Sequence, residues 1–408
     1  MEVLHPRCAG LDVHKREVVA CMRIAEGGKV RREIRAFATT TSDLLALGDW
    51  LQEEDVTHVA MEATGSYWRP VWHVLYGMFE LVLANARAVK NVPGRKSDVK
   101  DAQWLADLLA HGLIQASFVP EQPIQELRDL TRTRKQLVRE RGRHVQRIQK
   151  VLEHANVKLS SVITDILGLS GRRILEAIIA GERDPERLAA LGDPRLKASK
   201  AELREALRGF VTDHHRFMLQ LHLDQVAALD SAIAHLEAKV EESLRPFRDV
   251  VERLDTIPGV DRRAAAVILA EAGADMSAFP THEHLISWAG LCRRLDETAG
   301  KRRSTRLRHG GNWLKETLVQ AAWAAVKDKD SYLHAKFVRI KRRAGAKKAI
   351  VAVAASMLTA AYYIIRDQTE YHDLGPDYFD RFDRDKLARR LLRRLDELGL
   401  NVEVQSAA

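Results

Sequence analysis

Cysteine is scarce in this 408-residue sequence, which contains only Cys8, Cys21 and Cys292. Three cysteines spaced so widely exclude both a disulfide framework and a metal site built from thiolates. A reducing compartment, the cytoplasm, is therefore expected. The first residues also lack the basic-then-apolar order of a secretion signal, because their apolar runs are short and interrupted by charges.

Long apolar runs are nearly absent as well, and only one segment has to be weighed as a membrane span. Ala349–Ile365 carries no charge and follows the basic segment Lys341–Lys348. Its length is at the lower limit for crossing a bilayer, about 17 residues. Alanine is only weakly apolar, however, and Ser356 and Thr359 lower the hydropathy further. We therefore expect a buried helix of a soluble domain and no membrane partner.

Aromatic residues make up only 6% of the chain, whereas charged residues make up 30% and hydrophobic residues 46%. This composition is typical of a soluble globular protein, and the length predicts two or three domains. The 65 Lys and Arg residues outnumber the 56 Asp and Glu residues, which gives a net charge of +9. Such an excess favours polyanionic partners.

The first part of the chain predicts an α/β domain with five short strands. A turn at Gly27-Gly28 separates the second strand from the third, and Thr40 is placed to cap the helix that follows. Three consecutive strands and then alternating helices and strands are the order of an RNase H-like fold, although other α/β domains also begin with hairpins. The five predicted strands are Cys8–His14, Glu17–Ile24, Val30–Phe37, Thr57–Glu62 and Glu80–Ala84.

Long helices are predicted after Leu113. The helix Ile124–Val157 is rich in Lys and Arg, and the helix Thr212–Leu244 carries an apolar heptad seam that ends before Pro246. Such a seam is equally consistent with packing inside one chain and with a coiled-coil arm between chains. The seam consists of Leu219, His222, Val226, Leu229, Ile233, Leu236 and Val240.

The whole chain is thus expected to be an α+β multidomain protein. We predict an RNase H-like α/β domain at 1–118, a helical coiled-coil region at 119–250, a mostly α-helical C-terminal domain at 251–372 and a polar helical tail at 373–408. In the third part, Pro258-Gly259-Val260 resembles a helix-hairpin-helix turn, whose amides can hold a phosphate. Asp261 would repel that phosphate, so a tight interhelical turn is the alternative.

Four acidic residues stand where the predicted topology can bring them together. Asp12 ends the first strand, Glu62 ends the fourth, and Asp98 and Asp101 open a helix. Carboxylates that face one another repel unless cations neutralise them, and such a group is the ligand set of a two-metal site for phosphodiester chemistry. The alternative for Asp98 and Asp101 is an ordinary acidic helix start.

Motifs around these acids resemble the DEDD insertion-sequence transposases, relatives of the Piv-type DNA invertases. The N-terminal motifs are GLDVHK, MEATGSYW and KSDVKDA, and the C-terminal ones include IPGVDRRAAAVILAEAG, WAGLCRR and ETAGKRRSTRLRHGG. The resemblance implies a RuvC-like N-terminal domain in which Asp12, Glu62, Asp98 and Asp101 are catalytic and bind two Mg²⁺ ions, with Mn²⁺ as a substitute. It also implies a bacterial transposase or site-specific recombinase, nucleoid-associated when active.

The same resemblance indicates a hydroxyl nucleophile in the C-terminal domain. The family uses the serine of a Glu-Ser-Ala-Gly-type motif, whereas this sequence has Thr298 at that position, in Glu297-Thr298-Ala299-Gly300. Threonine can act as a nucleophile, but its β-branch crowds the attack. Either Thr298 works, or this copy is impaired; Ser304 is a substitute.

Three basic segments are candidates for nucleic-acid binding, and their few aromatic residues favour contacts with a nucleic-acid backbone. The resemblance implies donor and target DNA, a structured non-coding guide RNA, and a homo-oligomer between dimer and tetramer. The candidates are Arg132, Arg134, Lys135, Arg139, Arg143 and Arg147 in the first segment, Lys301, Arg302, Arg303, Arg306 and Arg308 in the second, and Lys341, Arg342 and Arg343 in the third.

Two other functions remain open at this point. A RuvC-like structure-specific nuclease would use water as its nucleophile and would not need Thr298. A non-catalytic coiled-coil protein would bind nucleic acid through the basic segments, and its acids would only cap helices.

Overall fold

A computed structural model describes residues 2–63, 65–85, 98–293, 296–298, 301–304, 306–307, 312–381 and 384–400; of residues 98–100, 296–298, 301–304, 312, 380, 384–387 and 390 it describes the backbone alone. The chain divides into two compact units, Met1–Pro120 (unit 1) and Glu121–Ala408 (unit 2). Unit 1 is an α/β unit, and unit 2 is mostly helical. The finer four-part division stays a prediction.

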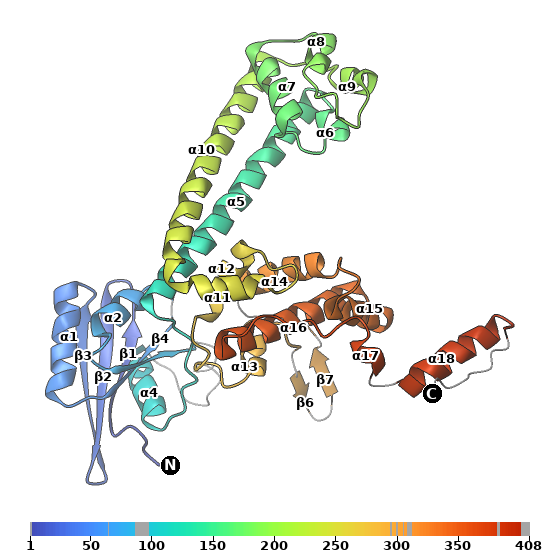
Figure 1. Cartoon of the computed structure of the whole chain (residues 1–408). Helices are drawn as coiled ribbons and strands as arrows, with labels where there is room; N and C mark the ends of the chain where they lie inside the picture. The colour runs from blue at the N-terminus through green and yellow to red at the C-terminus, as the bar shows by residue number, and fades with distance from the viewer. Residues whose placement is uncertain are drawn as a thin grey trace. The chain divides into compact units, whose positions relative to one another are not determined.

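Unit 1 contains a five-stranded sheet in the order β3-β2-β1-β4-β5 (Figure 1). The first three strands are antiparallel neighbours, and β4 and β5 run parallel to β1. The sequence-based strands are therefore confirmed to within two residues at each end. The elements of unit 1 are β1 (Arg7–Val13), β2 (Glu17–Glu26), β3 (Lys29–Ala38), α1 (Thr41–Glu53), β4 (His58–Glu62), α2 (Trp68–Leu75), β5 (Glu80–Ala84) and α4 (Asp98–Ala110).

Helices cover both faces of this sheet. Alternate residues of β1, such as Leu11, pack with α1 and α2 in one large apolar core. The opposite face contacts α4, and a Cβ atom at Gly10 would lie 2.3 Å from the carbonyl oxygen of Ala102. Only glycine therefore allows α4 to lie this close to β1. At the start of α1, the Thr40 hydroxyl accepts a hydrogen bond from the amide of Asp43, as expected for an N-cap.

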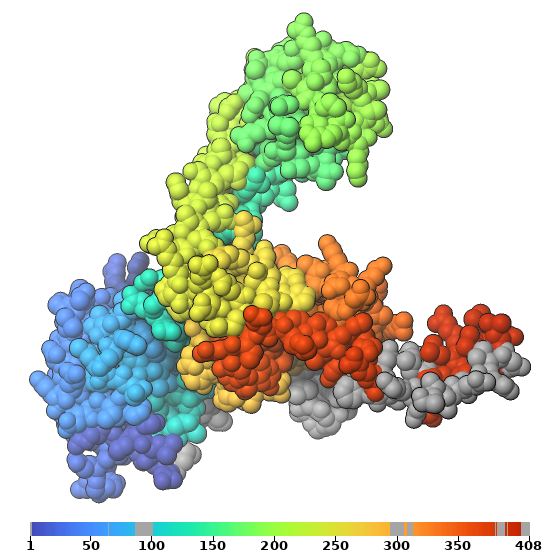
Figure 2. Space-filling view, viewed as in Figure 1, coloured from blue at the N-terminus to red at the C-terminus, as the bar shows by residue number. Residues whose placement is uncertain are grey.

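Unit 2 begins with the long helix α5 (Gln122–His154), which lies along α10 (Asp213–Ser243). The heptad seam of α10 is in contact with α5 within one chain, because Leu219 and Val226 share a core with Ile148. Figure 2 shows the intervening helices as a compact mass at one end of the thinner α5–α10 pair. They are α6 (Leu159–Val162), α7 (Leu169–Ala180), α8 (Pro185–Ala190) and α9 (Lys200–Ala206).

The rest of unit 2 is built around α16 (Ala346–Asp367), the helix that was weighed as a membrane span. It is long and apolar enough to cross a membrane, with a mean hydropathy of 1.7, but it packs against α11, α13, α14 and α15. It is therefore a core helix, and no membrane protein is indicated. The other elements are η1 (Arg245–Phe247), α11 (Arg248–Asp255), α12 (Arg262–Ala272), α13 (His282–Trp288), β6 (Asp296–Thr298), β7 (Lys301–Ser304), α14 (Asn312–Ala325), α15 (Tyr332–Ala344), α17 (Tyr378–Arg381) and α18 (Arg384–Glu397).

The turn before α12 serves helix packing. Gly259 has a φ of +79°, and a Cβ atom there would lie 2.3 Å from the carbonyl oxygen of Ala321 in α14. Asp261 caps α12, because its Oδ1 accepts a hydrogen bond from the amide of Ala264 at 2.8 Å. The glycine thus faces a neighbouring helix, and a carboxylate occupies the helix start. These contacts favour the tight interhelical turn over a phosphate cradle.

Candidate functional site

Asp12 lies one residue before the end of β1, and Glu62 ends the adjacent parallel strand β4 on the same face of the sheet. Leu11 pairs with Met61 between β1 and β4, and both side chains belong to the core under α1 and α2. Because side chains alternate along a strand, Asp12 and Glu62, each one residue further on, point to the α4 face. The Asp12 side chain is 15% exposed, and its Oδ2 lies 3.2 Å from Nε2 of His14.

Helix α4 runs along β1 toward these two acids. The Cys8 thiol donates to the carbonyl oxygen of Ala106 at 3.5 Å, and two residues further along β1, Gly10 faces Ala102. Two strand residues and four helix residues span nearly the same distance, about 6–7 Å. Continuing that step aligns the first residue of α4, Asp98, with Asp12.

Asp101 lies on a neighbouring stripe of the same helix. Leu105 and Leu108, four and seven residues after it, share a small core with Ala84 of β5, the residue that pairs with Glu62. Residues four apart lie on one side of a helix, so Asp101 is on the side of α4 that faces β4 and β5. The side chain of Asp98 lies outside the described residues.

The donors that the sequence predicts for a metal site are carboxylates of unit 1. Within the described part of the chain, no three His, Cys, Asp or Glu side chains are near enough to hold one ion. The backbone nevertheless directs Asp12, Glu62 and Asp101 to one region, and carboxylate oxygens are the ligands that Mg²⁺ prefers. The donor chemistry therefore fits a hard divalent cation.

The two cysteines on the α4 face do not provide an alternative nucleophile. Burial raises the pKa of the Cys8 thiol to about 12 and that of the Cys21 thiol to about 11. Both thiols are therefore protonated at neutral pH, and a thiol is a poor nucleophile. Their small side chains instead give α4 room to approach the sheet.

Thr298 lies at the end of β6, in a short antiparallel hairpin with β7. It pairs with Lys301, and Glu297 pairs with Arg302. An isolated bridge between Arg293 and Leu307 closes the stem of this hairpin. The side chains of Thr298, Ser304, Lys301, Arg302 and Arg303, and all of Arg308, lie outside the described residues, while Arg306 is exposed.

Most cations in the first half of α5 contact acids from other helices of unit 2. Arg132 forms a two-pronged ion pair with Glu271, with N–O distances of 2.7 and 2.8 Å, and the Glu271 side chain is only 1% exposed. Arg134 pairs with Glu237 at 2.9 Å. Arg141, which lies further along, pairs with Asp230. These cations hold the helices of unit 2 together.

Glu316 of α14 receives two further cations of α5, Lys135 and Arg139. Its burial opposes ionisation, but the two cations outweigh the burial, so the pKa of Glu316 is lowered. The ring of Trp313, one helical turn earlier, lies 5.2 Å from the guanidinium of Arg139 and 5.7 Å from the ammonium of Lys135. The sequence analysis did not single out Trp313, Glu271 or Glu316. The sequence does carry a signal for Glu271, which is an acid within the apolar run of α12.

The part of α5 beyond Arg141 differs from the part before it. Arg143, Arg147 and Lys150 are exposed, and none of the ion pairs found among the described residues involves them. Lys341, Arg342 and Arg343 at the end of α15 are also exposed, and Lys341 lies 5.6 Å from the ring of Phe337. These six cations are available to a polyanion.

Comparisons with known proteins agree with the motifs. Residues 9–157 match a family model for the DEDD transposases of IS110 elements, described as "Transposase", and residues 251–339 match one described as "Transposase IS116/IS110/IS902 family". The chain is also similar to the insertion element IS900 uncharacterized 42 kDa protein of Mycobacterium paratuberculosis, with 25% identity over 332 residues that cover 72% of this chain and 81% of that protein.

The two matched stretches together cover more than half of the chain and include all four acids and Thr298. Such domains support a transposase or recombinase that acts on DNA, and a DEDD domain suggests the use of a divalent metal. The chain belongs to the IS110 family of DEDD transposases.

Proposed function

We propose that this protein is a Mg²⁺-dependent transposase that cuts and rejoins DNA through the hydroxyl of Thr298. Unit 1 would be its RNase H-like, RuvC-like domain, in which Asp12, Glu62, Asp98 and Asp101 hold two Mg²⁺ ions. The observation that carries the proposal is the placement of Asp12 and Glu62 at the ends of adjacent strands, on the face covered by the helix that begins at Asp98. Three strands followed by alternating helix and strand support the RNase H-like assignment.

In this mechanism the carboxylates bind the cations and orient the scissile phosphate. Bound Mg²⁺ would polarise the phosphodiester and stabilise the leaving oxygen. The Thr298 oxygen attacks phosphorus, loses its proton and forms a protein–DNA ester, while the P–O bond to the leaving strand breaks and that strand takes up a proton. A hydroxyl of a second strand then attacks the ester and restores the threonine hydroxyl. Each step exchanges one P–O bond for another.

The partners follow from the same proposal. Exposed cations on α5 and α15, with the basic residues of the Thr298 hairpin, would hold donor DNA, target DNA and a structured guide RNA by their phosphates. A dimer or tetramer would bring the strands together, and the protein would work at the bacterial nucleoid. Phosphate contacts carry no sequence information, so base pairing by the RNA would supply the specificity.

The proposal is tested with full-length protein on a donor–target DNA pair in Mg²⁺. We expect Asp12→Asn to reduce strand exchange on the order of 1000-fold while DNA binding is retained, because only the transition state needs the metal. Exchange at the parent rate in Asp12→Asn would refute the metal site. Glu33→Gln, on the other face of the sheet, is the control.

A second measurement separates the proposed transposase from a nuclease that uses water. A protein–DNA adduct that survives denaturant is expected in the parent and absent in Thr298→Ala, with Thr298→Ser at least as active as the parent because serine removes the β-branch. Cleavage without an adduct, unchanged in Thr298→Ala, would favour the nuclease. Sequencing the RNA that copurifies with the protein tests for the guide.

A further inference from the structure

Asp107 of α4 lies between two arginines of the sheet. Nε of Arg23 donates to Oδ1 of Asp107 at 2.9 Å, and Nη2 of Arg32 donates to the same oxygen at 2.8 Å. The Arg23 side chain is only 4% exposed. A buried charge is tolerated only when it is paired, so displacement of Asp107 would leave the Arg23 guanidinium without its partner. The two arginines therefore hold α4 against β2 and β3.

The contacts of Asp107 with Arg23 and Arg32 form a clamp, and this clamp fixes the position of more than Asp107 itself. Helix α4 is continuous from Asp98 to Ala110, so Asp107 and the acids of its first two turns move together. The close approach of Ala102 to Gly10 seats the middle of the helix on β1. The contact between Gly10 and Ala102 sets the distance of α4 from the sheet, and the clamp sets the direction of the helix axis. A helix freed at Asp107 can slide or pivot at Gly10, and either movement shifts Asp98 and Asp101 relative to Asp12.

We infer that Asp107, held by Arg23 and Arg32, is a positioning residue for the carboxylate site. It does not touch the reacting atoms; it aligns the two acids of α4 with the two acids of the sheet. The inference rests on the proposed function, because it assigns the clamp to the proposed metal site. Metal sites need their ligands held by supporting contacts, and loss of such contacts typically weakens metal binding by 10–100-fold.

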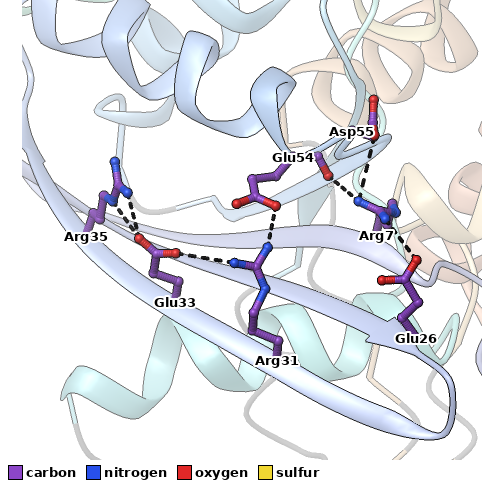
Figure 3. Close-up of polar contacts among 7 residues, drawn as sticks. All are labelled: Arg7, Glu26, Arg31, Glu33, Arg35, Glu54 and Asp55. Carbon is purple, nitrogen blue, oxygen red and sulfur yellow. Dashed lines mark hydrogen bonds and ion pairs between the residues drawn. The ribbon is translucent and has the colours of Figure 1, made fainter.

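The other face of the same strand provides a matched control. Arg31, next to Arg32 in β3, points to the opposite side of the sheet, where it pairs with Glu54 and Glu33 (Figure 3). Its side chain is 53% exposed, and that of Arg32 is 39% exposed. Arg31→Met and Arg32→Met therefore each remove a half-exposed cation from one strand, but only the second removes a contact with α4.

The experiment measures Mn²⁺ binding to full-length, nucleic-acid-free protein by isothermal titration calorimetry. We expect Asp107→Asn to weaken binding on the order of 10-fold. Arg32→Met should weaken it about twofold to fivefold, because its pair is partly exposed, and Arg31→Met should leave it unchanged. Asp107→Glu, which keeps the charge, should recover most of the affinity. Hydrogen exchange adds a second readout: amides of α4 should exchange faster in Asp107→Asn, and those of β1 should not.

The outcomes separate this inference from the proposed function. If Asp12→Asn abolishes Mn²⁺ binding while Asp107→Asn and Arg32→Met bind like the parent, the positioning role is wrong and the metal site stands. If Asp12→Asn binds Mn²⁺ like the parent, both are wrong. Should Asp107→Asn lose its cooperative thermal transition, Arg32→Met decides the question, because it leaves the buried pair of Arg23 and Asp107 in place.

Discussion

The acids of unit 1 and the cations of unit 2 are arranged by opposite principles. In unit 1, strand topology directs two acids, Asp12 and Glu62, to one end of one face of the sheet. In unit 2, the cations in the first half of α5 each contact an acid of another helix, such as Glu271 or Glu237. Like charges gathered by a fold require a ligand, whereas opposite charges brought together satisfy one another. The comparison supports the proposed catalytic role of unit 1 and assigns helix cohesion to this part of α5.

Removal of Glu271 is expected to have the largest effect, because it breaks an ion pair that holds α5 to α12. Glu271→Ala leaves Arg132 without its two-pronged partner and creates a cavity beside α5. We expect the free energy of unfolding to fall by about 3 kcal/mol, as for other buried pairs that lose one member. Chemical denaturation followed by circular dichroism measures the change.

An exposed pair of the same unit is the control for that measurement. Glu176 pairs with Arg172 one turn away on α7, and both side chains are about half exposed. Glu176→Ala should therefore change the unfolding free energy by less than about 0.5 kcal/mol. An equal fall in the free energy of unfolding in the two variants would show that the buried Glu271 contact stabilises the fold no more than an exposed pair does.

The parts of α5 before and after Arg141 provide a smaller and sharper test. Changing Arg143, Arg147 and Lys150 to Gln should weaken duplex binding roughly 10-fold or more at 0.15 M salt and flatten the salt dependence of log K by about three units of slope. The matched variant changes Arg134, Lys135 and Arg139 to Gln. It should lose stability while its salt slope stays near that of the parent, because those three cations already pair with acids.

Fluorescence anisotropy with labelled duplex DNA, repeated over a series of salt concentrations, measures both slopes. A larger loss of slope in the Arg134, Lys135 and Arg139 variant would contradict the assignment. It would mean that nucleic acid displaces Glu237 and Glu316 from these cations when it binds.

Local patterns predicted much of this fold from the sequence. Short runs of β-branched or alternating apolar residues placed the five strands, and the seam of α10 predicted a helix that the structure places at Asp213–Ser243. The positions of Asp12 and Glu62 followed from strand ends alone. The sequence could not predict which cations of α5 form ion pairs, because their acidic partners lie up to 177 residues away in the chain. For the same reason nothing local indicated that Asp107 contacts two arginines.

The smallest expected effect is the pH dependence of stability that His222, in the seam of α10, contributes. His222 is 8% exposed, its ring lies 5.3 Å from that of His144, and burial lowers its pKa, with His144 and Arg147 adding to the effect. The folded α5–α10 pair thus binds fewer protons than the unfolded chain does. Its stability should be complete above pH 6.5, the ordinary pKa of histidine, and should fall as the pH drops below that value.

His222→Leu removes the titrating group while keeping an apolar seam. Thermal unfolding of parent and variant at pH 5 and pH 7.5 should show a smaller drop at the acid pH in the variant. An equal drop would assign the acid sensitivity to other groups. Because the substitution lies in α10 of unit 2 and removes no carboxylate of unit 1, Mn²⁺ affinity at pH 7.5 should be the same in both proteins.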